Sequence, residues 1–365
     1  MKISNITVYK ADIPLRESFR IAIMEITNAQ NLYLKIETDE GLYGMGEASP
    51  FWRICGETQA ISLAAARDLA LLLKGKNPLA IEARIADIEG YLDNNPTIRS
   101  AFDMALYDIL GKAAGLPLYA LLGGEKRELV TDLTIGINDP EYMAGRAKEI
   151  VAQGFKAIKV KLGTTAADDI ARITAIRKAI GDAVPIRIDA NQGWDFNTAL
   201  EVLNALEPMG IQYCEQPVVN WNYIDMAHLR RRTSIPIMAD DGLKDHHDAF
   251  KLCSQDCCDY LNIKLSKAGG IRNSLNICAV AESSGKACMV GCMLESRLGL
   301  SAGAHLSSAR SIVKFCDLDS ALLLAEDPVT GGISYDGEKV VLPDAPGLGA
   351  DVDPAFLSRL ESFTI

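Results

Sequence analysis

Charged side chains recur at the ends of short β-rich runs in this 365-residue sequence. A single charge at a strand end is usually just solvated, but a charge at the same position of five consecutive runs argues against that interpretation. Acids that neighbouring strands place together at one end of a sheet, here called the mouth, cannot all stay ionised without a cation. Several hard oxygen ligands suit Mg²⁺. The residues are Lys159, Lys161, Asp189, Glu215, Asp240 and Lys264.

The lysines of this set predict proton transfer. Residues two apart on a strand share a face, so Lys159 and Lys161 are expected to point the same way. Two ammonium groups side by side near a metal repel each other, which predicts a lowered pKa and a general base for one of them. Lys264, four runs further on, is expected to face Lys161 across the mouth. A base on each side of a bound carbon acid is the arrangement that proton exchange at that carbon requires.

The β-rich runs themselves repeat at a nearly constant spacing, with helical stretches between them. Eight starts that follow one another by 24 to 29 residues predict an α/β fold, a (β/α)7β modified TIM barrel in which the last helix is missing. Such a barrel carries its catalytic groups at the carboxyl ends of its strands. The runs are 131–135, 157–161, 186–190, 211–217, 235–240, 260–264, 287–291 and 315–319.

The first 125 residues follow another pattern. Alternating segments predict strands at 2–9, 30–37 and 42–47, and helical periodicity follows at 58–76, 79–92 and 97–115. Gly41, Gly44 and Gly46 are expected at turns and bulges. The tail leaves the barrel and is expected to complete this first unit. We therefore predict an α+β capping domain at 1–125, the catalytic barrel at 126–325 and a return to the capping domain at 326–365.

Composition limits the classes of partner. The 37 basic and 48 acidic residues give a net charge of −11, which argues against nucleic acid and anionic membranes as partners. No apolar run approaches a membrane span, and the N-terminus alternates like a strand. Nine cysteines without a CxxC pair are expected to be small buried hydrophobic residues. We expect a cytoplasmic protein with a small-molecule substrate, and assembly into a homo-oligomer stays open.

Several motifs resemble the muconate-lactonizing (muconate cycloisomerase) subgroup of the enolase superfamily, and the resemblance covers nearly the whole chain. Two further stretches, at 114–124 and 327–333, look like the family's links between capping domain and barrel. The motifs are KVK at 159–161, IDANQGW at 188–194, EQP at 215–217, MAD at 238–240 and NIKLSKAGG at 262–270.

The resemblance implies a role for each charged residue. Asp189, Glu215 and Asp240 are the implied Mg²⁺ ligands. Lys161 and Lys264 are the implied acid–base catalysts, and Lys159 is an electrostatic partner for an enolate. The sequence departs from the family at Asp241, where a glutamate is usual.

Asp317 and Asp319 look like the DxD motif of the dipeptide epimerases of this subgroup. There the two acids hold the free α-ammonium group of the substrate, and side chains on one strand face would form such a clamp. The resemblance therefore implies a Mg²⁺-dependent isomerase that inverts the α-carbon of the C-terminal residue of a dipeptide.

Specificity is expected from loops at 19–30 and 51–58, where the family's two specificity loops lie. Met24 falls where epimerases of L-Ala-D/L-Glu have an arginine, and with Ile23, Ile26 and Ile54 it predicts an apolar pocket for small or hydrophobic dipeptides. Arg53 reaching in would instead favour an acidic side chain, and Glu25 would favour a cationic one. Met293 and Leu294, after the seventh run, are further candidate substrate-binding residues.

The sequence leaves other activities open. They are an L-Ala-D/L-Glu epimerase, an N-acylamino acid racemase or a cycloisomerase of the same subgroup, an aldolase with a Schiff-base lysine, and a non-catalytic metal-binding barrel.

Overall fold

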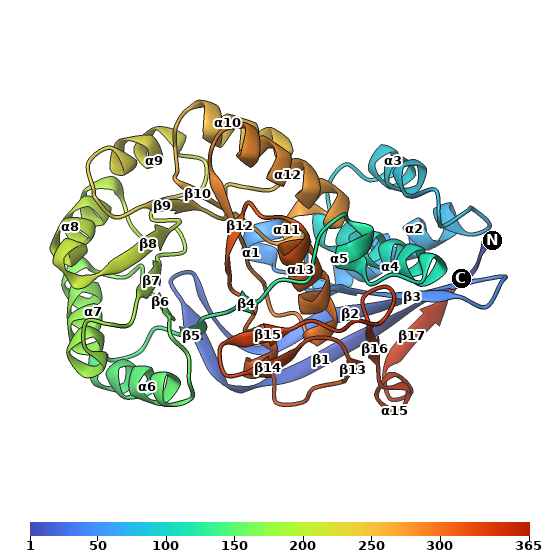
Figure 1. Ribbon diagram of the computed structural model, residues 1–365, viewed down its shortest axis with the longest axis horizontal. Helices are drawn as coiled ribbons and strands as arrows, with labels where there is room; N and C mark the ends of the chain where they lie inside the picture. The colour runs from blue at the N-terminus through green and yellow to red at the C-terminus, as the bar shows by residue number, and fades with distance from the viewer.

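The computed structural model describes all residues, 1–365, and contains an eight-stranded parallel barrel beside an antiparallel capping sheet (Figure 1). The barrel strands are hydrogen-bonded in chain order, which confirms the predicted α/β barrel class. A parallel bridge between Thr131 and Cys316 links the first and last strand regions. The strands are β5 (Leu133–Ile135), β6 (Ile158–Lys161), β7 (Ile186–Asp189), β8 (Ile211–Glu215), β9 (Ile237–Ala239), β10 (Tyr260–Ile263), β11 (Ala287–Val290) and β12 (Val313–Cys316).

A helix follows each of the first seven barrel strands and covers its outer face. Only the four-residue α14 (Ser320–Leu323) follows β12, which agrees with the predicted loss of the eighth helix. Local capping is regular: Asp139, Thr165 and Asp195 each accept a backbone hydrogen bond at a helix start. The helices are α6 (Pro140–Ala152), α7 (Ala166–Ile180), α8 (Phe196–Leu206) with η1 (Glu207–Met209), α9 (Tyr223–Arg230), α10 (His246–Ser254), α11 (Leu265–Ala268), α12 (Ile271–Ser283) and α13 (Arg297–Ala309).

The capping unit is a four-stranded antiparallel sheet covered by helices. Gly44 and Gly46 of β3 permit close packing against α4, because an added Cβ would come within 2.0 and 1.9 Å of backbone oxygens of that helix. This close approach, rather than the turn or bulge expected from the sequence, explains both glycines. The elements are β1 (Ile3–Ile21), β2 (Met24–Thr38), β3 (Tyr43–Ala48), α2 (Gln59–Leu73), α3 (Ile81–Tyr91) and α4 (Pro96–Ala114), followed by α5 (Leu118–Leu121).

The predicted specificity loops are partly regular structure. Residues 19–30 form the far end of the hairpin of β1 and β2, in which Phe19 pairs with Ile26 and Ile21 with Met24. The hairpin reaches the barrel, where the backbone N–H of Ile137 donates to the oxygen of Arg20 at 2.8 Å. Residues 51–58 contain the short helix α1 (Trp52–Cys55). The longer segment is therefore a hairpin end rather than an irregular loop, because cross-strand hydrogen bonds fix it.

The C-terminal segment adds a strand to the capping sheet. Its last strand, β17 (Glu361–Thr364), pairs with β1 in the register Thr7 to Thr364. No helix has both the length and the apolar character needed to cross a membrane. The remaining elements are β4 (Leu129–Val130), β13 (Val329–Gly331), β14 (Ser334–Asp336), β15 (Lys339–Val341), β16 (Ala350–Val352) and α15 (Pro354–Leu357).

A buried carboxylate fastens the capping sheet to the barrel. Glu47 of β3 is fully buried and accepts 2.8 Å hydrogen bonds from the backbone N–H groups of Ser296 and Gly299, at the start of α13. The Nδ2 atom of Asn31 donates both to Glu47 and to the backbone oxygen of Leu294, each at 2.8 Å. These hydrogen bonds to Leu294 and Ser296 also fix the loop between β11 and α13.

Candidate active site

Strand register brings the predicted charged groups to one end of the barrel. Lys161 pairs with Asp189, and Asp189 pairs with Glu215, across three adjacent strands. Asp240 directly follows β9, and Lys264 directly follows β10. Parallel strands end on the same side of a sheet, which is why a constant position in the repeat becomes a cluster in space.

Three carboxylates form the centre of this cluster. Asp189, Glu215 and Asp240 are each 0% exposed, and one oxygen from each lies within 4.8 Å of the others. Burial, and then the nearby charge of Asp189, raise the pKa of Glu215 to about 8. Burial also opposes ionisation of Asp240, but Lys264 and Lys267 outweigh it and hold its pKa well below the usual range. This concentration of buried oxygen ligands can hold a hard divalent cation.

The three predicted lysines lie against these carboxylates. The Nζ atom of Lys161 is 2.6 Å from Oδ2 of Asp189, and that of Lys264 is 2.8 Å from Oδ2 of Asp240. The Nζ atom of Lys159 lies 2.8 Å from Oε2 of Glu215. All three lysines are buried.

The lysine electrostatics differ from the sequence expectation. Burial by itself lowers the pKa of Lys159 and of Lys264, yet the neighbouring carboxylates outweigh burial and the pKa of each lies above its ordinary value. The lowered pKa that the sequence predicts for one lysine of the pair Lys159 and Lys161 is therefore not found at Lys159 when only the protein's own charges act. The acids around each lysine outnumber the cations near it.

Hydrogen-bond donors that were not predicted orient each carboxylate. Asn191 donates from its backbone N–H to Oδ1 of Asp189 at 2.8 Å, and Asn262 donates from Nδ2 to Oε1 of Glu215 at 2.8 Å. Lys267 contacts both Oδ1 and the backbone oxygen of Asp240, and it is 1% exposed. A signal for Lys267 was present, because it is the second lysine of the motif at 262–270.

The backbone is strained where β7 and β8 end. Asn191, Gln192 and Gln216 have φ values of 42°, 68° and 36°, in the left-handed region that such residues rarely adopt. Gln192 donates from Nε2 to Oδ2 of Asp241 at 2.7 Å. Asp241, the departure from the family pattern, thus fixes the loop after β7. Burial, and then the charge of Asp240, raise the pKa of Asp241 to about 7.

Asp317 and Asp319 follow β12 and enter the same mouth. Because β12 ends at Cys316, the two acids lie on the connection to α14. The sequence predicts that they lie on one strand face, and this expectation is wrong. Oδ2 of Asp317 lies 2.6 Å from Nζ of Lys159, and Oδ2 of Asp319 accepts the backbone N–H of Thr134 at 2.7 Å. Burial, and then the charge of Asp317, raise the pKa of Asp319 to about 8.

An apolar cavity of about 60 Å³ opens between Lys161 and Lys264. Ile54 and Ile26 line it as expected, together with Met293 and Leu294. Met24, at the hairpin tip, and Ile23 do not line it, and Arg53 points from α1 to solvent. The alternation of β1 places Phe19 and Ile21 there, and Phe51 comes from the residue before α1; the sequence did not single out these three side chains. They and the remaining lining residues are Phe19, Ile21, Phe51, Asn191, Asp241 and Cys292.

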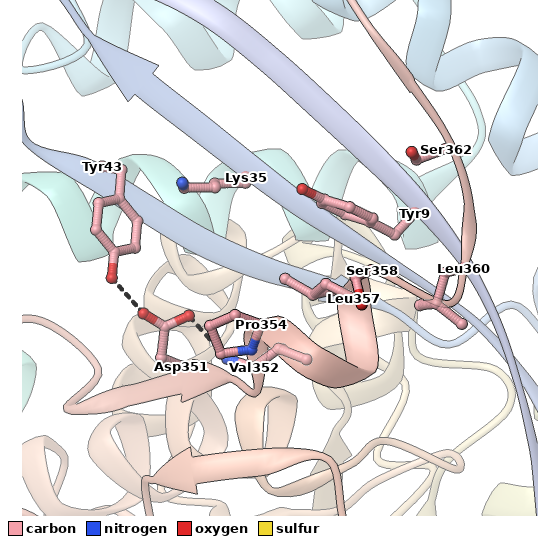
Figure 2. Close-up of a pocket in the computed structure, with 10 residues that line it drawn as sticks. All are labelled: Tyr9, Lys35, Tyr43, Asp351, Val352, Pro354, Leu357, Ser358, Leu360 and Ser362. Carbon is pink, nitrogen blue, oxygen red and sulfur yellow. Dashed lines mark hydrogen bonds between the residues drawn. The ribbon is translucent and has the colours of Figure 1, made fainter.

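A larger cavity lies in the capping unit. It has a volume of about 390 Å³ and is lined by β1, β2, β3 and the C-terminal segment, where Tyr43 hydrogen-bonds to Asp351 beside Lys35 (Figure 2). It contains none of the strand-end acids or lysines, so it has no part in the chemistry predicted for them.

Two family models match the chain. Residues 3–123 match the mandelate racemase/muconate lactonizing enzyme N-terminal domain, and residues 142–356 match the enolase C-terminal domain-like family. These matches agree with the resemblance seen in the sequence motifs.

Characterised relatives cover nearly all of the chain. A D-Ala-D/L-Ala epimerase of Cytophaga hutchinsonii is 41% identical over the whole of both chains. A crystal structure of a dipeptide epimerase from that organism, complexed with Mg and D-Ala-L-Val, superposes with a TM-score of 0.99. A hydrophobic dipeptide epimerase of Enterococcus faecalis is 39% identical over 96% of this chain and 99% of its own. An L-Ala-D/L-Glu epimerase of Clostridium acetobutylicum is 39% identical over the same shares.

Proposed function

The chain belongs to the mandelate racemase/muconate lactonizing enzyme family of the enolase superfamily, and we propose that it is a Mg²⁺-dependent dipeptide epimerase. It inverts the α-carbon of the C-terminal residue of a dipeptide. The observation that carries this proposal is the pair Lys161 and Lys264, which line one cavity beside three buried carboxylates. Two bases and a cation site around one cavity are what a 1,1-proton transfer needs.

Asp189, Glu215 and Asp240 fit a magnesium ion. Their donor set is three carboxylates, all hard oxygen ligands, buried and within ligand distance of one another. When bound there, Mg²⁺ supplies a positive centre that stabilises negative charge on the substrate carboxylate. Asn191, Asn262 and Lys267 orient the three ligands through the contacts described above, which limits the reorganisation that binding requires.

The two lysines carry the proton. One removes the α-proton, and the other protonates the opposite face of the same carbon, so the centre inverts. Lys159, buried between Glu215 and Asp317, places a fixed positive charge beside the enolate oxygen atoms as they gain charge. The apolar wall of Phe51 and Ile54 keeps water from the carbanionic carbon.

Asp317 and Asp319 bind the α-ammonium group at the other end of the substrate. Their buried carboxylates provide the negative charge that a free amine requires, and an N-acylated substrate would leave them without a partner. This arrangement favours dipeptides over N-acylamino acids.

The cavity favours small or short branched C-terminal side chains. Its volume of about 60 Å³ is well below the roughly 150 Å³ that accommodates a benzene ring. Arg53 is exposed and outside the cavity, so this arginine does not supply a cation for a glutamate side chain. We therefore propose that D,L- and L,L-dipeptides ending in alanine or valine are better substrates than those ending in glutamate.

A deuterium screen tests this function. Pools of dipeptides are incubated with the enzyme in D₂O with Mg²⁺, and mass spectrometry records one deuterium in the C-terminal residue of each substrate. We expect fastest incorporation for small apolar C-terminal residues and no incorporation with EDTA. Faster exchange of L-Ala-L-Glu than of L-Ala-L-Ala would contradict the specificity, and exchange that is insensitive to EDTA would contradict the metal.

We place the domain boundaries near residues 125 and 325. A cytoplasmic location agrees with nine free thiols, because a reducing compartment keeps thiols unpaired. The net charge of −11 argues against binding to nucleic acid or anionic membranes.

A further inference from the structure

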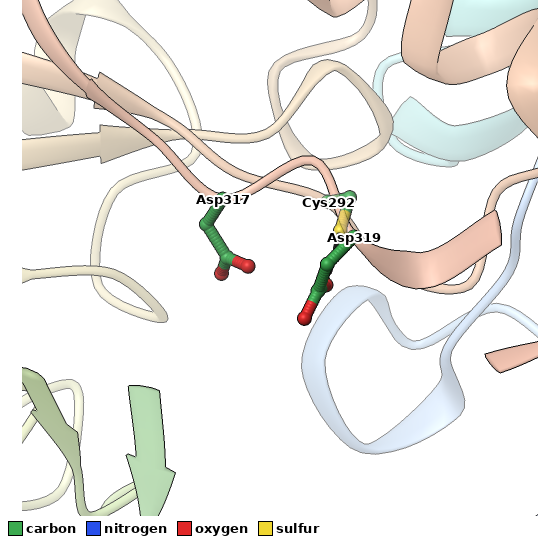
Figure 3. A group of neighbouring side chains, drawn as sticks. All are labelled: Cys292, Asp317 and Asp319. Atoms are coloured by element: carbon green, nitrogen blue, oxygen red, sulfur yellow. Dashed lines mark hydrogen bonds between the residues drawn. The ribbon is translucent and has the colours of Figure 1, made fainter. Parts of the chain in front are cut away.

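A thiol lies beside the two acids that follow β12. Cys292, in the loop after β11, forms a cluster with Asp317 and Asp319, in which one ligand atom of each lies within 4.8 Å of the others. Its Sγ atom is 3.8 Å from Oδ1 of Asp319. Figure 3 shows the side chains of the two acids directed to the same side, with Cys292 adjacent to Asp319.

Part of this cluster has no protein partner. Asp317 is 4% exposed, its Oδ2 atom is taken by Lys159, and its Oδ1 atom has no hydrogen-bond partner. A buried carboxylate oxygen without a donor is costly and indicates that a cationic ligand completes the site. Asp132, also fully buried nearby, is paired with Arg187 at 2.8 Å. The unpartnered oxygen of the cluster is therefore that of Asp317, for which Lys159 supplies no second contact.

We propose that Cys292, Asp317 and Asp319 form a second cation site, which binds Zn²⁺ in competition with the α-ammonium group of the dipeptide. The metal site stands on the geometry alone, whereas the competition rests on the proposed function. The site is separate from the three carboxylates of Asp189, Glu215 and Asp240, although Lys159 contacts acids of both.

The donor set selects zinc over magnesium. Thiolate sulfur is a soft ligand that Zn²⁺ accepts and Mg²⁺ does not, and three protein ligands leave one position for water. For a tetrahedral ion with Zn–S of about 2.3 Å and Zn–O of about 2.0 Å, sulfur and oxygen lie about 3.5 Å apart. The 3.8 Å between Cys292 and Asp319 is close to that spacing. On binding, the Cys292 thiol releases its proton to water and its sulfur takes up the metal.

Cobalt provides a direct test of the metal site. With the three-carboxylate site filled by excess Mg²⁺, Co²⁺ added to the full-length protein is expected to give a thiolate-to-cobalt absorption band in the near ultraviolet, which added Zn²⁺ abolishes. Cys292→Ala is expected to lose the band, and Cys253→Ala, which removes another partly exposed thiol, is expected to keep it. A band that survives in C292A, or no band in the wild type, would overturn the site. This measurement needs no activity, so it stands even if the proposed function fails.

Inhibition kinetics test the competition. Under saturating Mg²⁺, Zn²⁺ is expected to inhibit competitively with respect to the dipeptide, with an inhibition constant at least about tenfold higher for C292A than for the wild type or C253A. Inhibition competitive with Mg²⁺ but not with the dipeptide, or equal in C292A and wild type, would place the ion on the three-carboxylate site and refute the proposal. Absence of dipeptide exchange in the uninhibited wild type would instead refute the proposed function.

Discussion

Removing one lysine at a time separates the two halves of the proposed proton transfer. In Lys161→Ala, epimerisation in both directions is expected to fall by about 10² to 10⁴, which is about 3 to 5 kcal/mol in the barrier, because one of the two proton-transfer groups is lost. One diastereomer, however, should still exchange its α-hydrogen through Lys264 at close to the wild-type rate. Lys264→Ala is expected to retain exchange of the other diastereomer only.

The structure indicates that both variants remain folded. After Lys161 is removed, Asp189 still lies 3.5 Å from Nζ of Lys159, and after Lys264 is removed, Asp240 keeps its contact with Lys267. Neither buried carboxylate is left without a cation, so the roughly 3 to 5 kcal/mol cost of an isolated buried charge is avoided.

Proton NMR in D₂O on separate L,L and L,D dipeptides measures both reactions in one sample. The disappearance of the α-proton signal reports exchange, and the diastereomer ratio reports inversion. Lys148→Ala, an exposed lysine on α6, is the control and is expected to behave as the wild type. If each variant exchanges both diastereomers, or if one variant loses both exchanges while the other loses neither, the assignment of one lysine to each face is wrong.

Three further substitutions test other parts of the site. Asp319→Asn is expected to lower kcat/KM for dipeptides by about 10- to 100-fold, because the ammonium contact is weakened, while calorimetry is expected to show unchanged Mg²⁺ affinity. An unchanged kcat/KM would contradict this role. Asp240→Asn is expected to abolish the rise in Tm that Mg²⁺ gives the wild type, and an equal rise would contradict a ligand role. Burial first of all raises the pKa of Glu47 to about 7 from its ordinary 4.5. The folded state therefore holds the extra proton, so the free energy of unfolding should fall by up to about 3 kcal/mol as pH rises from 4.5 through 7. Glu47→Gln should flatten that dependence in denaturant titrations, and an unchanged slope would refute it.

The barrel and the charged groups at its mouth were predictable because both depend on the regular spacing of the strands along the sequence. A strand-and-helix repeat of constant length puts every strand end on one side of the sheet, so Asp189, Glu215 and Lys264 could be brought together from their positions alone. The motifs around these residues then indicated one enzyme family and, through it, the type of reaction. The missing eighth helix was also visible, as a tail whose pattern stops being helical after 319.

The lining of the cavity and the charge environment of the lysines depended on which segments, distant in the sequence, contact each other. Met24 falls at the position expected from the family but lies at the tip of a hairpin and outside the cavity, whereas Phe51, which the sequence did not single out within the segment 51–58, lines it. The direction of the lysine pKa shifts could not be predicted from the sequence either, because it depends on how many carboxylates surround each ammonium group in three dimensions.

The sequence by itself therefore determined the fold class and the placement of three acids and two lysines at the strand ends, because these follow from local periodicity and from residue types within single segments. Tertiary structure alone decided the size of the substrate cavity and the contact of Lys267 with Asp240. It also decided the juxtaposition of Cys292 with Asp317 and Asp319. Each of these joins side chains from segments whose relative placement no local pattern encodes, and burial against those neighbours sets their charge and accessibility.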